Sequence, residues 1–221
     1  MATAGRWRRP ERFYDLLAPL ARLLVGLLAN LRVVGAERIP THGGVLLAAN
    51  HVSFLDPLVL ALALYDCGRR KVRFLALADL FDQPLLGWVL RGTRMIPVAR
   101  GRGVERMAED AGAALEAGQA VLVYPEGTIV SPEQTRPARP GAGLVALRAK
   151  VPVLPIASCG VERRHRRRRR LPRLRRRVTV VIGPPVDLSS WRGRLDRQAQ
   201  LEASAALLAS VQALRHQPQG R

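Results

Sequence analysis

Short apolar runs alternate along this chain with segments of helical periodicity, and this alternation constrains the possible folds more than any other feature. The runs expected to form strands are 45–49, 72–76, 120–124, 153–157 and 178–182. The segments expected to form helices are 57–65, 80–90, 104–117 and 141–149. Interleaved strands and helices predict an α/β layer architecture with a largely buried sheet. With 221 residues, of which 48% are hydrophobic, the chain can form one compact domain.

The two ends of the chain differ from this central region. From Phe13 to Leu31 the apolar residues, mostly leucines, recur at intervals of three and four positions, which predicts an amphipathic helix. This helix either packs on the core or lies in a bilayer interface with Arg22 toward water. A C-terminal helix is expected over 195–214. The predicted division is a membrane-associating helix at 1–32, a central domain at 33–190, and a helix and tail at 191–221.

The chain is strongly basic, with a formal net charge of +19. Eleven of the positive charges lie between Arg163 and Arg177, a stretch without acidic residues. Such an excess predicts an anionic partner, and phospholipid surfaces, nucleic acid and phosphorylated substrates all qualify. Because the run lacks the interleaved aromatic residues that stack on bases, we expect a solvated loop or contact with anionic lipid rather than with nucleic acid.

The two cysteines, Cys67 and Cys159, stand far apart in the sequence. Neither has a second cysteine or a histidine at metal-ligand spacing, so we expect neither a disulfide framework nor a metal site. A reducing, cytoplasmic setting fits this cysteine usage best.

One histidine follows an apolar run and has a carboxylate close behind it. His51 comes directly after 45–49, so it would leave the end of a buried strand. Asp56 can then reach back to one imidazole nitrogen, which fixes the tautomer and leaves the other nitrogen to take a proton from an alcohol. The other interpretation is structural, with His51 as a helix cap and Asp56 as its partner. Since the chain has no Gly-x-Ser-x-Gly elbow, a base here would activate a substrate hydroxyl.

Two further polar groups follow apolar stretches. Glu126, Gly127 and Thr128 come after 120–124, where glycine permits close backbone approach and the two polar side chains can hydrogen-bond the hydroxyls of a ligand. Arg100 closes another apolar stretch, and its guanidinium suits bidentate recognition of a phosphate. Taken singly, the first group could be a turn and the arginine a solvated surface residue.

Four segments taken together resemble the sequence blocks of the 1-acylglycerol-3-phosphate acyltransferase family, which includes other lysophospholipid acyltransferases. In chain order they are Asn50-His51-x-Ser53-x-x-Asp56-Pro57, Ile96-Pro97-Val98-Ala99-Arg100, Tyr124-Pro125-Glu126-Gly127-Thr128 and Val151-Pro152-Val153-Leu154-Pro155-Ile156. The specific part of the likeness is the histidine-aspartate pair combined with Pro-Glu-Gly-Thr. The resemblance implies a single α/β domain whose mixed, mostly parallel central sheet is flanked by helices.

The resemblance also implies a chemistry. It assigns His51 as general base and Asp56 as its orienting partner in the transfer of a fatty acyl group to the free hydroxyl of a lysophospholipid. The implied acceptor is 1-acylglycerol 3-phosphate, giving phosphatidic acid, and the donor is acyl-CoA or acyl-carrier protein as a co-substrate. Neither a metal, a cofactor nor nucleic acid is expected, and the expected location is the anionic cytoplasmic face of the cell membrane. The residues assigned to substrate binding are Asn50, Ser53, Arg100, Glu126, Gly127, Thr128, Arg136 and Arg139.

Departures from the family pattern leave the acceptor less constrained than acyl transfer itself. Ala99 and Ile129 stand where the family usually has an acid and an arginine, so Arg136 or Arg139 is expected to supply the missing phosphate contact. Another lysolipid or glycerol 3-phosphate is an alternative acceptor. A lipid-binding relative without catalysis and an arginine-rich RNA-associated protein are alternatives of other classes.

Overall fold

The computed structural model describes residues 12–68, 70–99, 103–131, 134, 136–161 and 176–216. Within these residues the strands form one mixed sheet in the order β1-β7-β6-β2-β5-β3-β4. The strands are β1 (Ala29–Val34), β2 (Val45–Ala49), β3 (Val72–Leu77), β4 (Ile96–Val98), β5 (Ala120–Val123), β6 (Val153–Cys159) and β7 (Arg176–Ile182). Neighbouring strands run parallel except β6 and β7, which are antiparallel.

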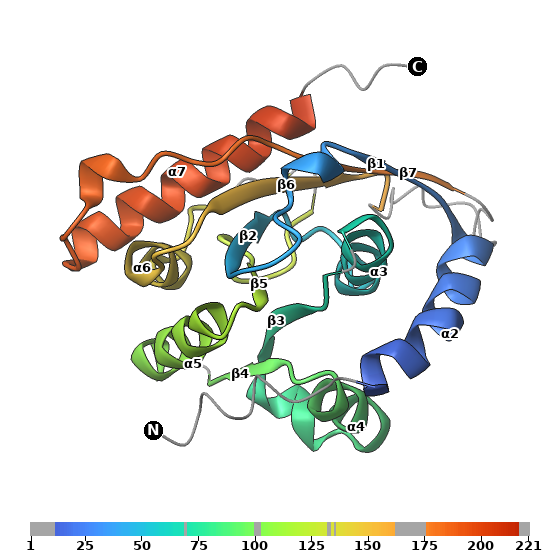
Figure 1. Ribbon diagram of the computed structural model, residues 1–221. Helices are drawn as coiled ribbons and strands as arrows, with labels where there is room; N and C mark the ends of the chain where they lie inside the picture. Colours follow the sequence, from blue (N-terminus) through green and yellow to red (C-terminus); the bar gives the residue numbers. More distant parts are fainter. Residues whose placement is uncertain are drawn as a thin grey trace.

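Helices cover both faces of this sheet (Figure 1). The α-helices are α2 (Arg12–Leu28), α3 (Asp56–Gly68), α4 (Pro84–Gly92), α5 (Val104–Glu116), α6 (Pro140–Arg148) and α7 (Arg197–His216). Short 3₁₀ helices are η1 (Ala36–Arg38), η2 (Ala78–Asp82) and η3 (Ser189–Trp191). Helices α2 and α3 pack on one face, and α5, α6 and α7 pack on the other.

Strand β2 shows why both faces are covered. All of its residues are buried, and successive side chains of a strand point to opposite faces. Val45, Leu47 and Ala49 accordingly join the core under α3, whereas Leu46 and Ala48 join the core under α5, α6 and α7. A strand that is apolar at every position is typical of the centre of a parallel sheet. The polar loop that follows β2 therefore emerges at the sheet edge, between the two helical layers.

The predicted fold class is confirmed, and the five expected strands are present with small shifts at their ends. The helix expected from Phe13 to Leu31 ends at Leu28, and its last part is wrong because Ala29–Val34 forms β1. Pairing with β7 fixes this strand, and helical periodicity does not report such pairing. The division at residues 32 and 190 stays a prediction, with the first boundary falling inside β1.

The segment 80–90, expected as one helix, consists of two elements. Helix η2 ends at Asp82, and α4 begins at Pro84. Proline has no backbone N–H and is favoured in the first turn of a helix, so it starts a new helix here rather than continuing the old one. The sequence pattern also does not reveal β4, which has only three residues.

Helix α2 packs against α3 and turns most of its leucines outward. Tyr14, Ala18 and Val25 are buried, while the side chains of Leu16 and Leu23 are 71% and 60% exposed. Most of the leucine stripe seen in the sequence is therefore the outer face of the helix. In the part of the chain that the structure describes, no helix has both the length and the apolar character needed to span a bilayer.

Candidate functional site

His51 lies in the short loop between β2 and α3, which begins at Asp56. Asp56 Oδ2 lies 3.1 Å from His51 Nδ1 and also accepts the backbone N–H groups of Val52 at 2.6 Å and Ser53 at 2.7 Å. Asp56 is fully buried, whereas the His51 side chain is 17% exposed. The carboxylate therefore folds the loop around itself and holds an imidazole that a substrate can reach.

This contact favours one tautomer of the neutral imidazole. A carboxylate accepts hydrogen bonds and does not donate them, so His51 carries its proton on Nδ1, toward Asp56. Nε2 is then the nitrogen with a lone pair, and it can take a proton from a hydroxyl group. When it does, the negative charge of the buried carboxylate stabilises the imidazolium.

The segment after β5 holds the backbone of His51. The Glu126 carboxylate accepts the His51 N–H at 2.9 Å, and the Val130 N–H donates to the His51 carbonyl at 2.7 Å. Glu126 is 6% exposed, and its burial raises the pKa of its carboxyl group. Because β2 and β5 are parallel neighbours, the two polar motifs that follow them meet at one edge of the sheet.

The ring of Tyr124 lies flat against the imidazole. The ring centroids of His51 and Tyr124 are 4.1 Å apart, with 13° between the ring planes. The Tyr124 hydroxyl is buried without a hydrogen-bond partner among the described residues, and burial raises its pKa well above the ordinary value. Stacking restricts rotation of the imidazole, and the face of an aromatic ring favours a neighbouring cation such as imidazolium.

Strand β6 meets the loop from the other side. Asn50 donates through Nδ2 to the Ser158 carbonyl at 3.0 Å and accepts the Ser158 N–H through Oδ1 at 2.8 Å. The Ser158 hydroxyl donates to Asp56 Oδ1 at 3.2 Å. Ser53 accepts the Leu55 N–H through its hydroxyl at 3.2 Å, so it also shapes the loop. The predicted roles of Asn50 and Ser53 in substrate binding stay predictions.

The turn that contains Gly127 brings one of the predicted phosphate-binding arginines to the site. Gly127 has a φ of +63°, in the left-handed region, and a Cβ there would lie 2.6 Å from the Arg139 side chain. The Arg139 N–H donates to the Pro125 carbonyl at 2.8 Å. Arg139 therefore lies against the turn that follows Glu126, with its side chain exposed.

The other predicted substrate residues are less closely placed. Thr128 is partly exposed and follows this turn directly, and Arg136 is exposed on the segment that leads to α6. Arg100 lies outside the described residues, as does most of the run from Arg163 to Arg177. The acceptor contacts of Thr128, Arg136 and Arg100 stay predictions, as does the solvated loop or lipid contact expected of the run.

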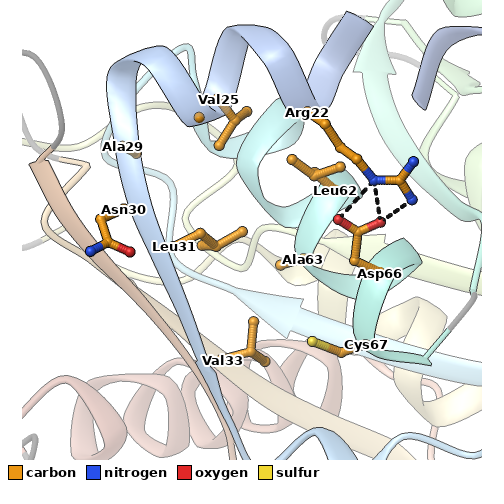
Figure 2. Close-up of a pocket in the computed structure, with 11 residues that line it drawn as sticks. Arg22, Val25, Ala29, Asn30, Leu31, Val33, Leu62, Ala63, Asp66 and Cys67 are labelled. Carbon is orange, nitrogen blue, oxygen red and sulfur yellow. Dashed lines mark hydrogen bonds and ion pairs between the residues drawn. The ribbon is translucent and has the colours of Figure 1, made fainter. Parts of the chain in front are cut away.

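A pocket of ≈ 640 Å³ lies between α2, β1 and α3 (Figure 2). Its walls include Val25, Leu31 and Leu62, and Arg22 there bonds Asp66, with 3.0 Å between Nε and Oδ1. None of the predicted catalytic or substrate residues lines this pocket. The pocket and the His51 loop are therefore different features, connected through α3, which starts at the loop and lines the pocket with its second half.

Two residues of the site follow from the structure rather than from sequence patterns. Ser158 is 102 positions from Asp56, and the pairing of β2 with β6 brings them together. Its signal in the sequence is weak, a single hydroxyl in the otherwise apolar strand before Cys159. Tyr124 belongs to a recognised motif, but its sequence position does not reveal that it stacks on His51.

Comparisons with known proteins bear on this arrangement. The family model described as Acyltransferase matches residues 30–159, which include His51, Asp56 and Glu126. The lyso-ornithine lipid O-acyltransferase of Pseudomonas aeruginosa is 36% identical over 141 residues, covering 62% of this chain and 50% of that protein. The 1-acyl-sn-glycerol-3-phosphate acyltransferase of Bacillus subtilis is 24% identical over 147 residues, covering 66% of this chain and 71% of that protein.

The fold has a counterpart among solved structures. The crystal structure of the 1-acyl-sn-glycerophosphate acyltransferase from Thermotoga maritima matches with a TM-score of 0.68 at 21% identity, covering 94% of this chain and 81% of that one. The likeness at this identity concerns the fold alone, and the chain spans about half the length of the Pseudomonas relative, 50% of it. Because the family model matches more than half of the chain, over residues that carry the His51 loop and the Glu126 turn, the chain belongs to the acyltransferase family.

Proposed function

We propose that this chain transfers a fatty acyl group from a thioester donor to the free hydroxyl of a lysophospholipid. The observation that carries the proposal is the buried Asp56 carboxylate, held 3.1 Å from His51 Nδ1 at the end of β2. Relatives named for a lyso-ornithine lipid and for 1-acyl-sn-glycerol 3-phosphate support this class of acceptor. Acyl-CoA or acyl-carrier protein is the proposed donor and co-substrate, without a metal or prosthetic group.

The proposed reaction is a direct transfer. The acceptor hydroxyl attacks the carbonyl carbon of the thioester while His51 Nε2 takes its proton, so a C–O bond forms and an oxyanion develops. The C–S bond then breaks, and the imidazolium returns the proton to the leaving thiolate. Asp56 keeps the imidazole oriented in both steps, because the Val52 and Ser53 N–H groups fix its carboxylate in turn.

The proposed acceptor carries a phosphate, as 1-acylglycerol 3-phosphate does. Arg139 supports this choice, because its exposed side chain lies against Gly127, next to the Glu126 that bonds the His51 backbone. A guanidinium binds a phosphate through two parallel hydrogen bonds. Glycerol 3-phosphate or another lysolipid is the alternative acceptor.

We expect the purified protein to transfer labelled acyl groups from acyl-CoA to lysophosphatidic acid faster than to neutral lysolipids. Arg139→Gln should raise the KM for lysophosphatidic acid roughly tenfold, because a charge-assisted hydrogen bond to the phosphate is lost. Arg148→Gln is the matched control, since it removes an α6 arginine that pairs with Glu105. Equal use of neutral lysolipids would contradict a phosphate-bearing acceptor, and lysolipid binding without any transfer would favour a non-catalytic relative.

We further propose that the chain works at an anionic membrane surface, on the cytoplasmic face of the cell membrane. Support comes from a surface that we call the α2–α4 surface, composed of Leu16, Leu20, Leu23, Leu27, Leu85 and Trp88, each more than half exposed. The rings of Phe13 and Trp88 meet edge to face at 4.6 Å, which joins the two helices. Exposed apolar side chains gathered on two neighbouring helices typically mark an interaction site, and the net charge of +19 favours anionic lipid.

Vesicles containing anionic lipid are expected to shift the emission of Trp88 to shorter wavelength, measured with Trp7 and Trp191 replaced by phenylalanine. Replacing Leu16, Leu20 and Leu23 together by glutamine should weaken vesicle binding at least tenfold, because apolar area no longer leaves water. The unfolding midpoint should stay within a few degrees, since these side chains are exposed. Leu195→Gln, on an exposed leucine outside this surface, is the control. Parent-like binding by the triple variant would exclude α2 as the anchor.

A further inference from the structure

Strand β6 reaches the catalytic carboxylate through one side chain. The Ser158 hydroxyl donates to Asp56 Oδ1 at 3.2 Å, and both residues are fully buried. The other donors to this carboxylate, His51 Nδ1 and the N–H groups of Val52 and Ser53, all bond Oδ2 and all come from the loop itself. Ser158 therefore ties the carboxylate to the sheet, whereas the other donors tie it only to its own loop.

The backbone of Ser158 is fixed on two sides. Toward β2, its N–H and its carbonyl are both bonded to the Asn50 side-chain amide, which continues the strand pairing past Ala49 and Ile156. Toward β7, it pairs with Val180 in the antiparallel ladder. A residue held by two neighbouring strands has little freedom to move, so its hydroxyl meets Asp56 from a defined position.

A hydroxyl at this buried strand position needs a hydrogen-bond partner. Ser158 is 0% exposed and stands in a strand whose other buried residues are apolar. Burying a hydroxyl costs free energy unless the group is hydrogen-bonded, and alanine would fill the strand position without that cost. The feature that serine adds over alanine is the bond to Asp56 Oδ1.

We propose that Ser158 is a positioning residue for proton transfer at His51. Its hydroxyl holds Asp56 Oδ1, so that Oδ2 stays aligned with His51 Nδ1 while the imidazole gains and loses a proton. A carboxylate held through Oδ2 alone can rotate about the Cβ–Cγ bond, and one held through both oxygens is fixed. The inference rests on the proposed function, because it affects a rate only if His51 acts as a base.

Steady-state kinetics of acyl transfer by Ser158→Ala test the inference. We expect kcat to fall roughly tenfold, the effect of losing a hydrogen bond to a charged group, with the KM of both substrates unchanged. In an Asp56→Ala background the same substitution should lower the residual rate no further, because Ser158 acts through the carboxylate that is then absent. A residue that merely supports the strand would lower both rates by the same factor.

Two variants make the test independent of folding defects. Thr93→Val removes another buried hydroxyl, which donates to the Val89 carbonyl at 2.6 Å at the end of α4, and kcat should stay at the parent level. Ser158→Cys keeps a weaker donor, so its kcat should lie between those of the parent and Ser158→Ala, and it replaces the alanine variant if that protein does not fold.

Different results would overturn the positioning role of Ser158 and the proposed acyl transfer. If the parent is active and folded Ser158→Ala keeps the parent kcat, the positioning role alone is overturned. The same holds if Ser158→Ala lowers kcat by equal factors in the parent and Asp56→Ala backgrounds. A parent protein without any acyl transfer would overturn the proposed function and this role with it.

Discussion

Replacing Asp56 by alanine is expected to lower acyl transfer by roughly 10²–10⁴-fold and the free energy of unfolding by about 3 kcal/mol. The rate falls because His51 loses the carboxylate that holds its Nδ1–H and stabilises the imidazolium. Stability falls because the N–H groups of Val52 and Ser53 and the hydroxyl of Ser158 lose their acceptor in the interior.

A carboxylate elsewhere in the chain provides the matched control. Asp187 also accepts a backbone N–H at 2.9 Å and a serine hydroxyl at 3.1 Å, both from Ser189, but it is exposed. Asp187→Ala should leave both the free energy of unfolding and the transfer rate close to the parent values, because water replaces the lost hydrogen bonds of an exposed carboxylate. Urea unfolding followed by circular dichroism measures stability, and a labelled-acyl assay measures the rate. An Asp56→Ala protein with the parent rate would show that the histidine needs no orienting partner.

Replacing His51 by alanine is expected to lower the rate by a similar roughly 10²–10⁴-fold with far less loss of stability. The imidazole is lost from Tyr124 and from Asp56, but the backbone N–H of residue 51 keeps its bond to Glu126. An aromatic pair contributes about 0.5–1.5 kcal/mol, so the unfolding midpoint should fall by only about 1–6 °C. His42→Ala, which removes an exposed imidazole bonded to the Thr41 hydroxyl, should change neither quantity.

The central layers of the fold are predictable from the sequence because their residues are apolar at every position. Val45 to Ala49 has no polar residue on either face, and such a run has few places other than the middle of a parallel sheet. Strand β1 is not predictable in this way, because its helical-looking leucine pattern continues from α2. Its conformation depends on residues 176–181 of β7, far away in the sequence.

The candidate site is predictable where its residues are close in sequence. His51 and Asp56 are five residues apart, so the reach of the carboxylate follows from their spacing, and the structure has the contact. Glu126 is expected near them because both motifs follow parallel strands. Its bond to the His51 N–H depends on the conformation of the two loops, which the sequence pattern does not predict. The Ser158 contact depends on the register of β2 with β6, which a single sequence does not reveal.

The orientation of the leucine face of α2 could not be predicted from the sequence for a different reason. The same leucine periodicity is expected of a helix packed on a core and of one in a bilayer interface. The structure buries the side with Ala18 and Val25 and exposes Leu16 and Leu23, because α2 packs against α3 with its other side turned to solvent. Periodicity thus predicts that α2 has an apolar face. Only the packing of the folded chain determines whether that face points to the core or to solvent.

Acyl transfer through His51 is tested most directly by one comparison of rates. Parent protein and His51→Ala are each incubated with acyl-CoA and 1-acylglycerol 3-phosphate, and phosphatidic acid and free CoA are both quantified. We expect the parent to release CoA in step with product and His51→Ala to show a kcat lower by roughly 10²–10⁴-fold with KM little changed. Product formation by folded His51→Ala at the parent rate would contradict the assignment of this histidine as the base.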